Sequence, residues 1–184
     1  MNRSLRRTPL VTSRAASAAD PSLYDPGMGK AAGLNHVSVV AHDLEESVAF
    51  YVDVLGLERL PTPDFGFPVQ WRRAGPLQVH VCERPDDPPT YAHFALEVDD
   101  VVGLYERARE LGILDRTSFG YAIAELPGGE AQLYIRDPAG NLIEIDHPKG
   151  AEARERIEEM ILFAERRPQP DGPTPRLFTA DLDR

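Results

Sequence analysis

Cysteine is almost absent from this sequence, and its scarcity excludes a disulfide framework. Cys82 is the one cysteine among 184 residues, so no disulfide can form within the chain. It stands in the apolar alternation of a predicted strand, which favours a packing role over a nucleophilic one. Long apolar runs are missing as well, since none approaches the ~18 residues that span a membrane. A reducing, cytoplasmic compartment is therefore expected.

Basic residues are outnumbered by acidic ones, which argues against polyanionic partners. The chain has 20 Lys and Arg against 30 Asp and Glu, with a formal net charge of −10 and a pI near 4.9. Nucleic acids and anionic membranes bind clustered Lys and Arg, so neither is an expected partner. Arginines are frequent before the first acid, Asp20, but no apolar segment follows them as a secretory signal requires.

Composition divides the chain into three regions. Residues 1–32 are rich in Ser, Ala, Arg, Pro and Gly without any period, which predicts a disordered tail. Residues 33–148 carry the strand and helix patterns of one folded domain, long enough to bury a core without disulfides. Residues 149–184 show helical spacing over 151–167 and then a proline-rich tail that cannot remain helical.

An internal repeat organises the folded domain into two modules, at about residues 34–84 and 91–148. Superposing His36 on His93 also aligns the glycines that end the two predicted helices, with one residue of slippage. A break rich in proline and aspartate separates the modules. Each module has the order strand–helix–strand–strand–strand, and each sheet needs a second layer on its open face. The pattern predicts an α+β fold built from two βαβββ modules.

Turn residues and helix caps set the expected element boundaries. In the first module we expect strands at 34–40, 57–60, 69–73 and 77–82, and a helix between the cap Asp43 and Gly56. In the second we expect a strand at 91–98, a helix from Asp99 or Asp100 to Gly112, and strand candidates at 117–119, 122–126, 131–137 and 141–146.

Four side chains stand out because the repeat places them in equivalent pairs. His36 and His93 lie in the first strand of their modules, and His80 and Glu144 lie in the middle of the last strand. Because side chains alternate along a strand, all four can point to one face. Three imidazoles and a carboxylate are suitable ligands for Fe, Ni, Zn, Co or Mn. The pattern therefore predicts a divalent metal site.

Other readings of these histidines remain open at this point. A single histidine in a strand is more often a satisfied core or surface residue than a ligand. Two histidines and one carboxylate also form the facial triad of non-haem Fe(II) oxygenases. His42 is interpreted as a loop residue and His147 as a surface residue.

Four segments carry a resemblance to a known family: Leu34–Val39, Ser47–Leu57, Ala92–Val98 and Tyr134–Ile145. The last contains an Arg-Asp-Pro-Ala-Gly-Asn turn leading into Leu-Ile-Glu and is the most specific. The sequence resembles the vicinal oxygen chelate superfamily, which includes glyoxalase I, methylmalonyl-CoA epimerase, fosfomycin-resistance transferases, extradiol dioxygenases and bleomycin-binding proteins. The resemblance covers about residues 34–148 and implies that the two modules form a curved mixed sheet.

The resemblance also implies roles for individual residues. By position, His36, His80, His93 and Glu144 correspond to the metal ligands of the superfamily. His80 departs from glyoxalase I and the epimerase, which resemble each other in having Glu or Gln there, and it is expected to be a fourth ligand or a general base. Tyr134 is a candidate donor of a proton or hydrogen bond, with packing as its alternative.

The implied activity is that of a metal-dependent lyase, isomerase or epimerase. Such an enzyme acts on a small substrate with vicinal oxygens through an enolate that the metal stabilises. The alternatives are an Fe(II) ring-cleaving dioxygenase and a metal-free drug-binding protein of the bleomycin-resistance type. In the superfamily, modules pair within one chain or between two subunits, and a homodimer is favoured here.

Overall fold

The computed structural model describes residues 31–175 and residue 177. The predicted disordered segment 1–32 therefore lies almost entirely outside the described residues, as does the end of the proline-rich tail. The described residues from Asn35 onward belong to one compact unit. No helix among the described residues has the length and apolarity needed to cross a membrane.

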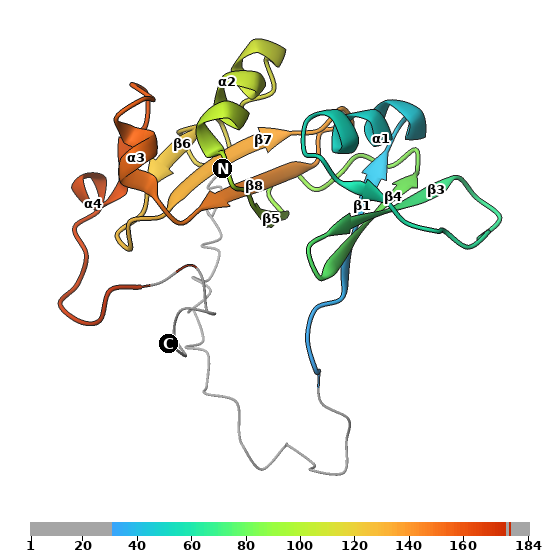
Figure 1. Cartoon of the computed structure of the whole chain (residues 1–184), viewed down its shortest axis with the longest axis horizontal. Coiled ribbons are helices and arrows are strands. Elements are labelled where there is room, and N and C mark those ends of the chain that lie inside the picture. Colours follow the sequence, from blue (N-terminus) through green and yellow to red (C-terminus); the bar gives the residue numbers. More distant parts are fainter. Residues whose placement is uncertain (1–30, 176, 178–184) are drawn as a thin grey trace, which may run out of the picture. The chain divides into compact units, whose positions relative to one another are not determined.

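The first module is a four-stranded mixed sheet with one helix. Its elements are β1 (His36–Ala41), α1 (Leu44–Asp53), β2 (Glu58–Arg59), β3 (Val69–Ala74) and β4 (Leu77–Glu83). The strand order is β1-β4-β3-β2, with β1 parallel to β4 and the other pairs antiparallel. Figure 1 shows α1 against one face of this sheet.

The second module repeats this arrangement and adds one strand. Its elements are β5 (His93–Glu97), α2 (Val101–Leu111), β6 (Ile123–Glu125), β7 (Ala131–Arg136), β8 (Leu142–His147) and β9 (Ile161–Leu162). The order is β5-β8-β7-β6-β9, with β5 parallel to β8. Figure 1 shows β8 and β7 side by side, with α2 above them. The predicted α+β fold of two βαβββ modules is confirmed, with the strands distributed over two mixed sheets.

Local signals in the sequence account for both long helices. The Asp43 side chain accepts a hydrogen bond from the Glu46 backbone N–H, and the Asp100 side chain accepts one from Gly103, so each aspartate caps a helix as predicted. Gly112 ends α2 with φ of 69°, a left-handed conformation that glycine adopts without strain.

The core lies between each sheet and its helix. Along β4, Val79 and Val81 are buried against the α1 side, while His80 between them faces the opposite side. Along β8, Ile143 and Ile145 are fully buried in the same way. This alternation is the period-2 pattern expected of strands with one face on a helix layer. It directs His80 and Glu144 away from the helices, as the sequence predicted.

Two expected elements differ in the structure. Residues 117–119 form no strand, because the Thr117 and Ser118 backbone N–H groups bond the Asp115 carboxylate in a tight loop instead. The helical pattern over 151–167 is divided into α3 (Gly150–Arg154), β9 and α4 (Phe163–Arg166). Strand β9 pairs with β6, whose backbone on that edge would otherwise lack partners.

A buried hydrogen-bond network joins the two modules. The Tyr51 hydroxyl of α1 donates to the Asp137 carboxylate at 2.8 Å, and Asn141 Nδ2 donates to the same carboxylate at 2.7 Å. Asn141 also exchanges hydrogen bonds with the Val40 backbone in β1. Burial and the Asp137 charge raise the pKa of Tyr51, so its hydroxyl stays a donor. The network fixes β1 against the β7–β8 turn of the same chain.

Candidate functional site

His36 and His80 meet on the open face of the first sheet. Their rings stack with centroids 4.2 Å apart, and the Trp71 indole stacks on the other side of His80 at 4.4 Å. Trp71 lies directly opposite His80 in the β3–β4 register, which explains the contact. A cavity of about 520 Å³ opens here, lined by Asn35, His36, Phe65, Trp71, Gln78 and His80.

Hydrogen bonds leave one nitrogen of each ring available. His36 Nδ1 lies 2.5 Å from Asn35 Oδ1, and His80 Nε2 lies 2.9 Å from Gln78 Oε1. With the amide oxygens as acceptors, these ring nitrogens carry the protons and the other nitrogen of each ring keeps a lone pair. Burial and then the nearby His36 lower the pKa of His80. A neutral His80 is the form required of a metal ligand or a general base.

His93 and Glu144 meet on the open face of the second sheet. His93 Nδ1 lies 3.0 Å from the Tyr91 carbonyl oxygen, which can only accept, so Nδ1 carries a proton. His93 Nε2 lies 3.1 Å from Glu144 Oε2, and the Glu144 side chain is only 8% exposed. A lone pair facing a buried carboxylate oxygen at this distance requires a proton or a cation between them. The pair therefore fits a cation.

Tyr134 contacts Glu144 rather than open space. The two residues are directly opposite in the β7–β8 register, and the Tyr134 hydroxyl is hydrogen-bonded to the carboxylate. Burial and Glu144 raise the pKa of Tyr134, so the hydroxyl stays protonated and donates. Tyr134 can thus orient Glu144 as an outer partner of a metal ligand does.

Asp146 belongs to the same face and was not singled out from the sequence. It is 4% exposed, hydrogen-bonded to Glu144, and its Oδ1 has no partner among the described residues. Burial and then the Glu144 charge raise the pKa of Asp146 to about 8. The signal was available, because Asp146 follows Glu144 by two residues in one strand and so shares its face.

The two pairs stay separate within one chain. His36 is brought to His80, and His93 is brought to Glu144. Among residues 31–175 and 177, however, no group of three or more His, Cys, Asp or Glu is arranged to hold a metal ion. The chain thus presents two half-sites, each with two of the four predicted ligands.

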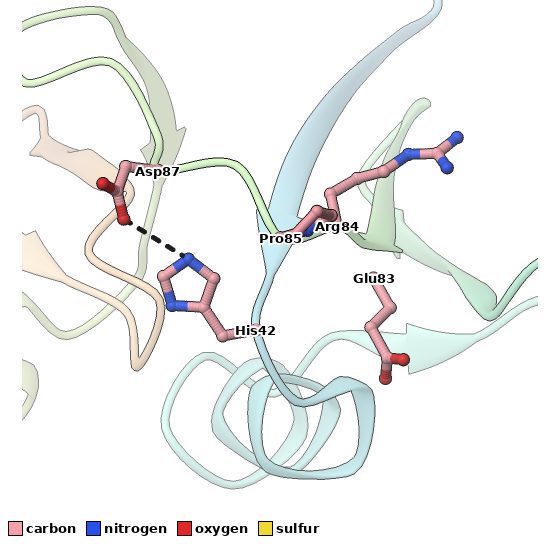
Figure 2. A pocket seen from close by; sticks show the side chains of 5 residues that line it. All are labelled: His42, Glu83, Arg84, Pro85 and Asp87. Carbon is pink, nitrogen blue, oxygen red and sulfur yellow. Dashed lines mark ion pairs between the residues drawn. The ribbon is translucent and has the colours of Figure 1, made fainter.

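A second hollow, of about 550 Å³, contains none of the predicted ligands. Figure 2 shows the His42 ring pointing toward Asp87, with Arg84 extending away from both. His42 Nε2 lies 3.7 Å from Asp87 Oδ1. Glu83 in this hollow accepts a hydrogen bond from the Leu44 backbone at the start of α1. These residues are at the end of β4 and in the break between modules. Their contacts are those of a helix start and a surface loop.

The family model for the Glyoxalase/Bleomycin resistance protein/Dioxygenase superfamily matches residues 33–145. Among curated proteins, lactoylglutathione lyase of Salmonella typhimurium is 29% identical over 131 residues, covering 64% of this chain and 94% of that protein. Glyoxylase I 4 of Arabidopsis thaliana is 28% identical over 123 residues, covering 61% of this chain and 68% of that protein.

Solved structures agree with this assignment. Lactoylglutathione lyase from Agrobacterium tumefaciens is 25% identical with a TM-score of 0.50, and covers 65% of this chain and 96% of its own. The oxidase ChaP-H2 is 28% identical with a TM-score of 0.51, and covers 64% of this chain and 97% of its own. Since the family model spans more than half of the chain, this protein belongs to the glyoxalase/bleomycin resistance protein/dioxygenase superfamily.

Proposed function

We propose that this protein is a divalent-metal-dependent enzyme of the glyoxalase type, a lyase, isomerase or epimerase for a small substrate with vicinal oxygens. The observation that carries the proposal is the pairing of His93 Nε2 with the buried Glu144 carboxylate at 3.1 Å. That pairing needs a proton or a cation between the two atoms, and a bound divalent metal ion would fill this place. The stacked pair His36 and His80 offers a matching set of imidazole ligands.

His36, His80, His93 and Glu144 would hold Fe, Ni, Zn, Co or Mn, and their tautomers support this role. When bound, the metal supplies Lewis-acid stabilisation of negative charge on the substrate oxygens. Because the two ligand pairs stay apart in one chain, we infer that each centre combines the first half-site of one copy with the second half-site of another. The protein would then act as a homodimer.

The remaining residues would position the ligands and move a proton. The Tyr134 hydroxyl donates to Glu144 and holds its carboxylate in place. If His80 is not the fourth metal ligand, its free ring nitrogen can instead accept a proton from a substrate carbon, and the flat contacts with Trp71 and His36 keep its ring in one orientation. Phe65 and Trp71, which line the cavity beside it, would exclude water from that proton transfer.

A ring-cleaving dioxygenase is the second candidate, and the surroundings of His80 favour it. His80 lies between two rings and is hydrogen-bonded to Gln78. If this fixed ring does not bind metal, His36, His93 and Glu144 remain as two histidines and one carboxylate, the ligand set of Fe(II) oxygenases. Similarity to an oxidase at 28% identity supports the same alternative.

The first experiment is metal analysis by mass spectrometry on wild type, His93→Ala and Glu144→Ala, with His147→Ala as the matched control. We expect about one equivalent of metal per chain in wild type and the control, and loss of it in the two site variants. His147 is a suitable control because its Nδ1 bonds the Val98 carbonyl outside both half-sites.

Two assays then separate the candidate reactions. Formation of lactoylglutathione without oxygen uptake would support the lyase, whereas oxygen uptake with a catechol after anaerobic Fe(II) loading would support the dioxygenase. A wild-type protein that stays metal-free after reconstitution with each ion would refute both. The metal-free, drug-binding function would then become the working hypothesis.

A further inference from the structure

Arg72 is a buried cation without an acidic partner among the described residues. The residue is 3% exposed, and it lies opposite the core residue Val79 in the β3–β4 register. Its side chain is therefore on the α1 side of the sheet, away from Trp71 and His80. Its Nη2 donates to Gln70 Oε1 at 3.0 Å, while its Nε has no hydrogen-bond partner in the described part of the chain. A buried guanidinium normally requires a compensating anion.

The cross-strand neighbour of Arg72 is a second cation, which increases the need for a compensating anion. Arg59 of β2 is directly opposite Arg72, and two like charges at such positions repel each other. Burial and then the Arg59 charge lower the pKa of Arg72. Neither arginine forms an ion pair with a described acidic residue. The adjacent cross-strand pair differs, because Arg73 is opposite Glu58 and forms an ion pair with it at 3.6 Å.

We propose that Arg59 and Arg72 form a binding site for an oxyanion, the phosphate or carboxylate group of a small molecule. An anion between the two guanidinium groups would remove their repulsion and supply the partner that Arg72 Nε lacks. The site is reachable, because β2 is the edge strand of its sheet and Arg59 is exposed. It lies on the opposite face from His36 and His80 and does not depend on the proposed metal chemistry.

Calorimetric titration of the full chain with inorganic phosphate at low ionic strength tests the proposal. Wild type should bind phosphate saturably, and Arg72→Met should bind about tenfold more weakly or not at all. Methionine keeps the length of the buried side chain while removing its charge, so the fold should be retained. Arg73→Met is the matched control, since it removes a neighbouring arginine that already has a partner, and it should bind phosphate as wild type does.

A parallel titration with succinate distinguishes phosphate from carboxylate ligands. Saturable binding of either anion that is lost in Arg72→Met supports the site. The absence of saturable binding of both anions to wild type, or equal binding by wild type and Arg72→Met, would overturn it. Analytical sedimentation of wild type and Arg72→Met measures whether the substitution changes self-association. If Arg72→Met weakens self-association and wild type binds neither anion, the partner of Arg72 is a carboxylate of a second copy and the small-anion site is refuted.

Discussion

At the scale of single residues, the sharpest electrostatic feature is Asp115. Burial alone would raise the pKa of this carboxyl group, but hydrogen bonds from the Ser118 and Thr117 backbone and from Arg136 outweigh it and lower the pKa to about 2. Arg136 Nε lies 2.5 Å from the carboxylate. The loop that carries Phe119 and Tyr121 beside Tyr134 is thereby tied to β7. Asp115 thus supports the second half-site without touching it.

Replacing Asp115 should make the free energy of unfolding vary less with pH in the acidic range. The pKa of Asp115 is lower in the folded protein than in the unfolded chain. The ionised carboxylate therefore stabilises the fold fully above about pH 4, and this stabilisation is lost as the pH falls toward 2. We expect Asp115→Asn to lower the free energy of unfolding by about 2 kcal/mol at pH 7 and by much less near pH 2.5. Urea unfolding at both pH values measures this. The control is Asp87→Asn, which should change the free energy of unfolding little because the Asp87 side chain is 95% exposed. An equal loss of stability in Asp115→Asn at both pH values would contradict the role given to Asp115.

For single residues, the sequence predicted the sheet face of a side chain wherever the alternation along one strand was enough to define it. The positions of His80 and Glu144 between buried aliphatic residues already predicted which face they take. The partners that set their chemistry were harder to foresee. Trp71 reaches His80, and Tyr134 reaches Glu144, through strand register, which turns and loops determine at a distance. Whether these residues bind metal stays a prediction.

At the scale of elements, the segment after β8 is part of the fold although the family match ends at residue 145. Ala153, Ile157 and Met160 join the hydrophobic core. Glu159 binds Arg116 at 2.6 Å and accepts a hydrogen bond from the Tyr105 hydroxyl, which ties the segment to α2. The sequence predicted a helix with Ile157, Met160 and Ile161 on its apolar side; Ile157 and Met160 are buried, but neither lies in a helix. The sequence could not predict β9, because pairing with β6 depends on an edge that only the assembled sheet presents.

Shortening a buried side chain of this segment should destabilise the whole protein. Ile157 is 3% exposed, so Ile157→Ala should lower the free energy of unfolding by about 2–4 kcal/mol. Leu111→Ala is the control, because Leu111 is 43% exposed and its truncation should cost well under 1 kcal/mol. Urea denaturation followed by circular dichroism compares the two. Equal, small effects would indicate that the segment is a dispensable appendage.

At the scale of the whole molecule, the separation of the half-sites leads to a complementation test. His80→Ala removes a ligand from the first half-site, and Glu144→Ala removes one from the second. If sites form between copies, a mixed dimer of the two variants contains one intact site and one with both defects. Tagged co-expression and metal analysis should therefore find about half of the wild-type metal in the mixed dimer. If sites formed within one chain, every site would be defective and the mixed dimer would be as metal-poor as each variant alone.

The buried network of Tyr51, Asp137, Asn141 and Val40 has a consequence for how such a centre would respond to dilution. The network joins the two modules of one chain, and the described residues of that chain hold no group of three or more His, Cys, Asp or Glu arranged for a metal ion, so the proposed centre would form between copies. Metal occupancy and association would then be linked by mass action. Ion loading would slow the exchange of subunits, and a chelator would favour free chains. The cellular concentration of the protein would then control what fraction of it is associated and able to bind the metal.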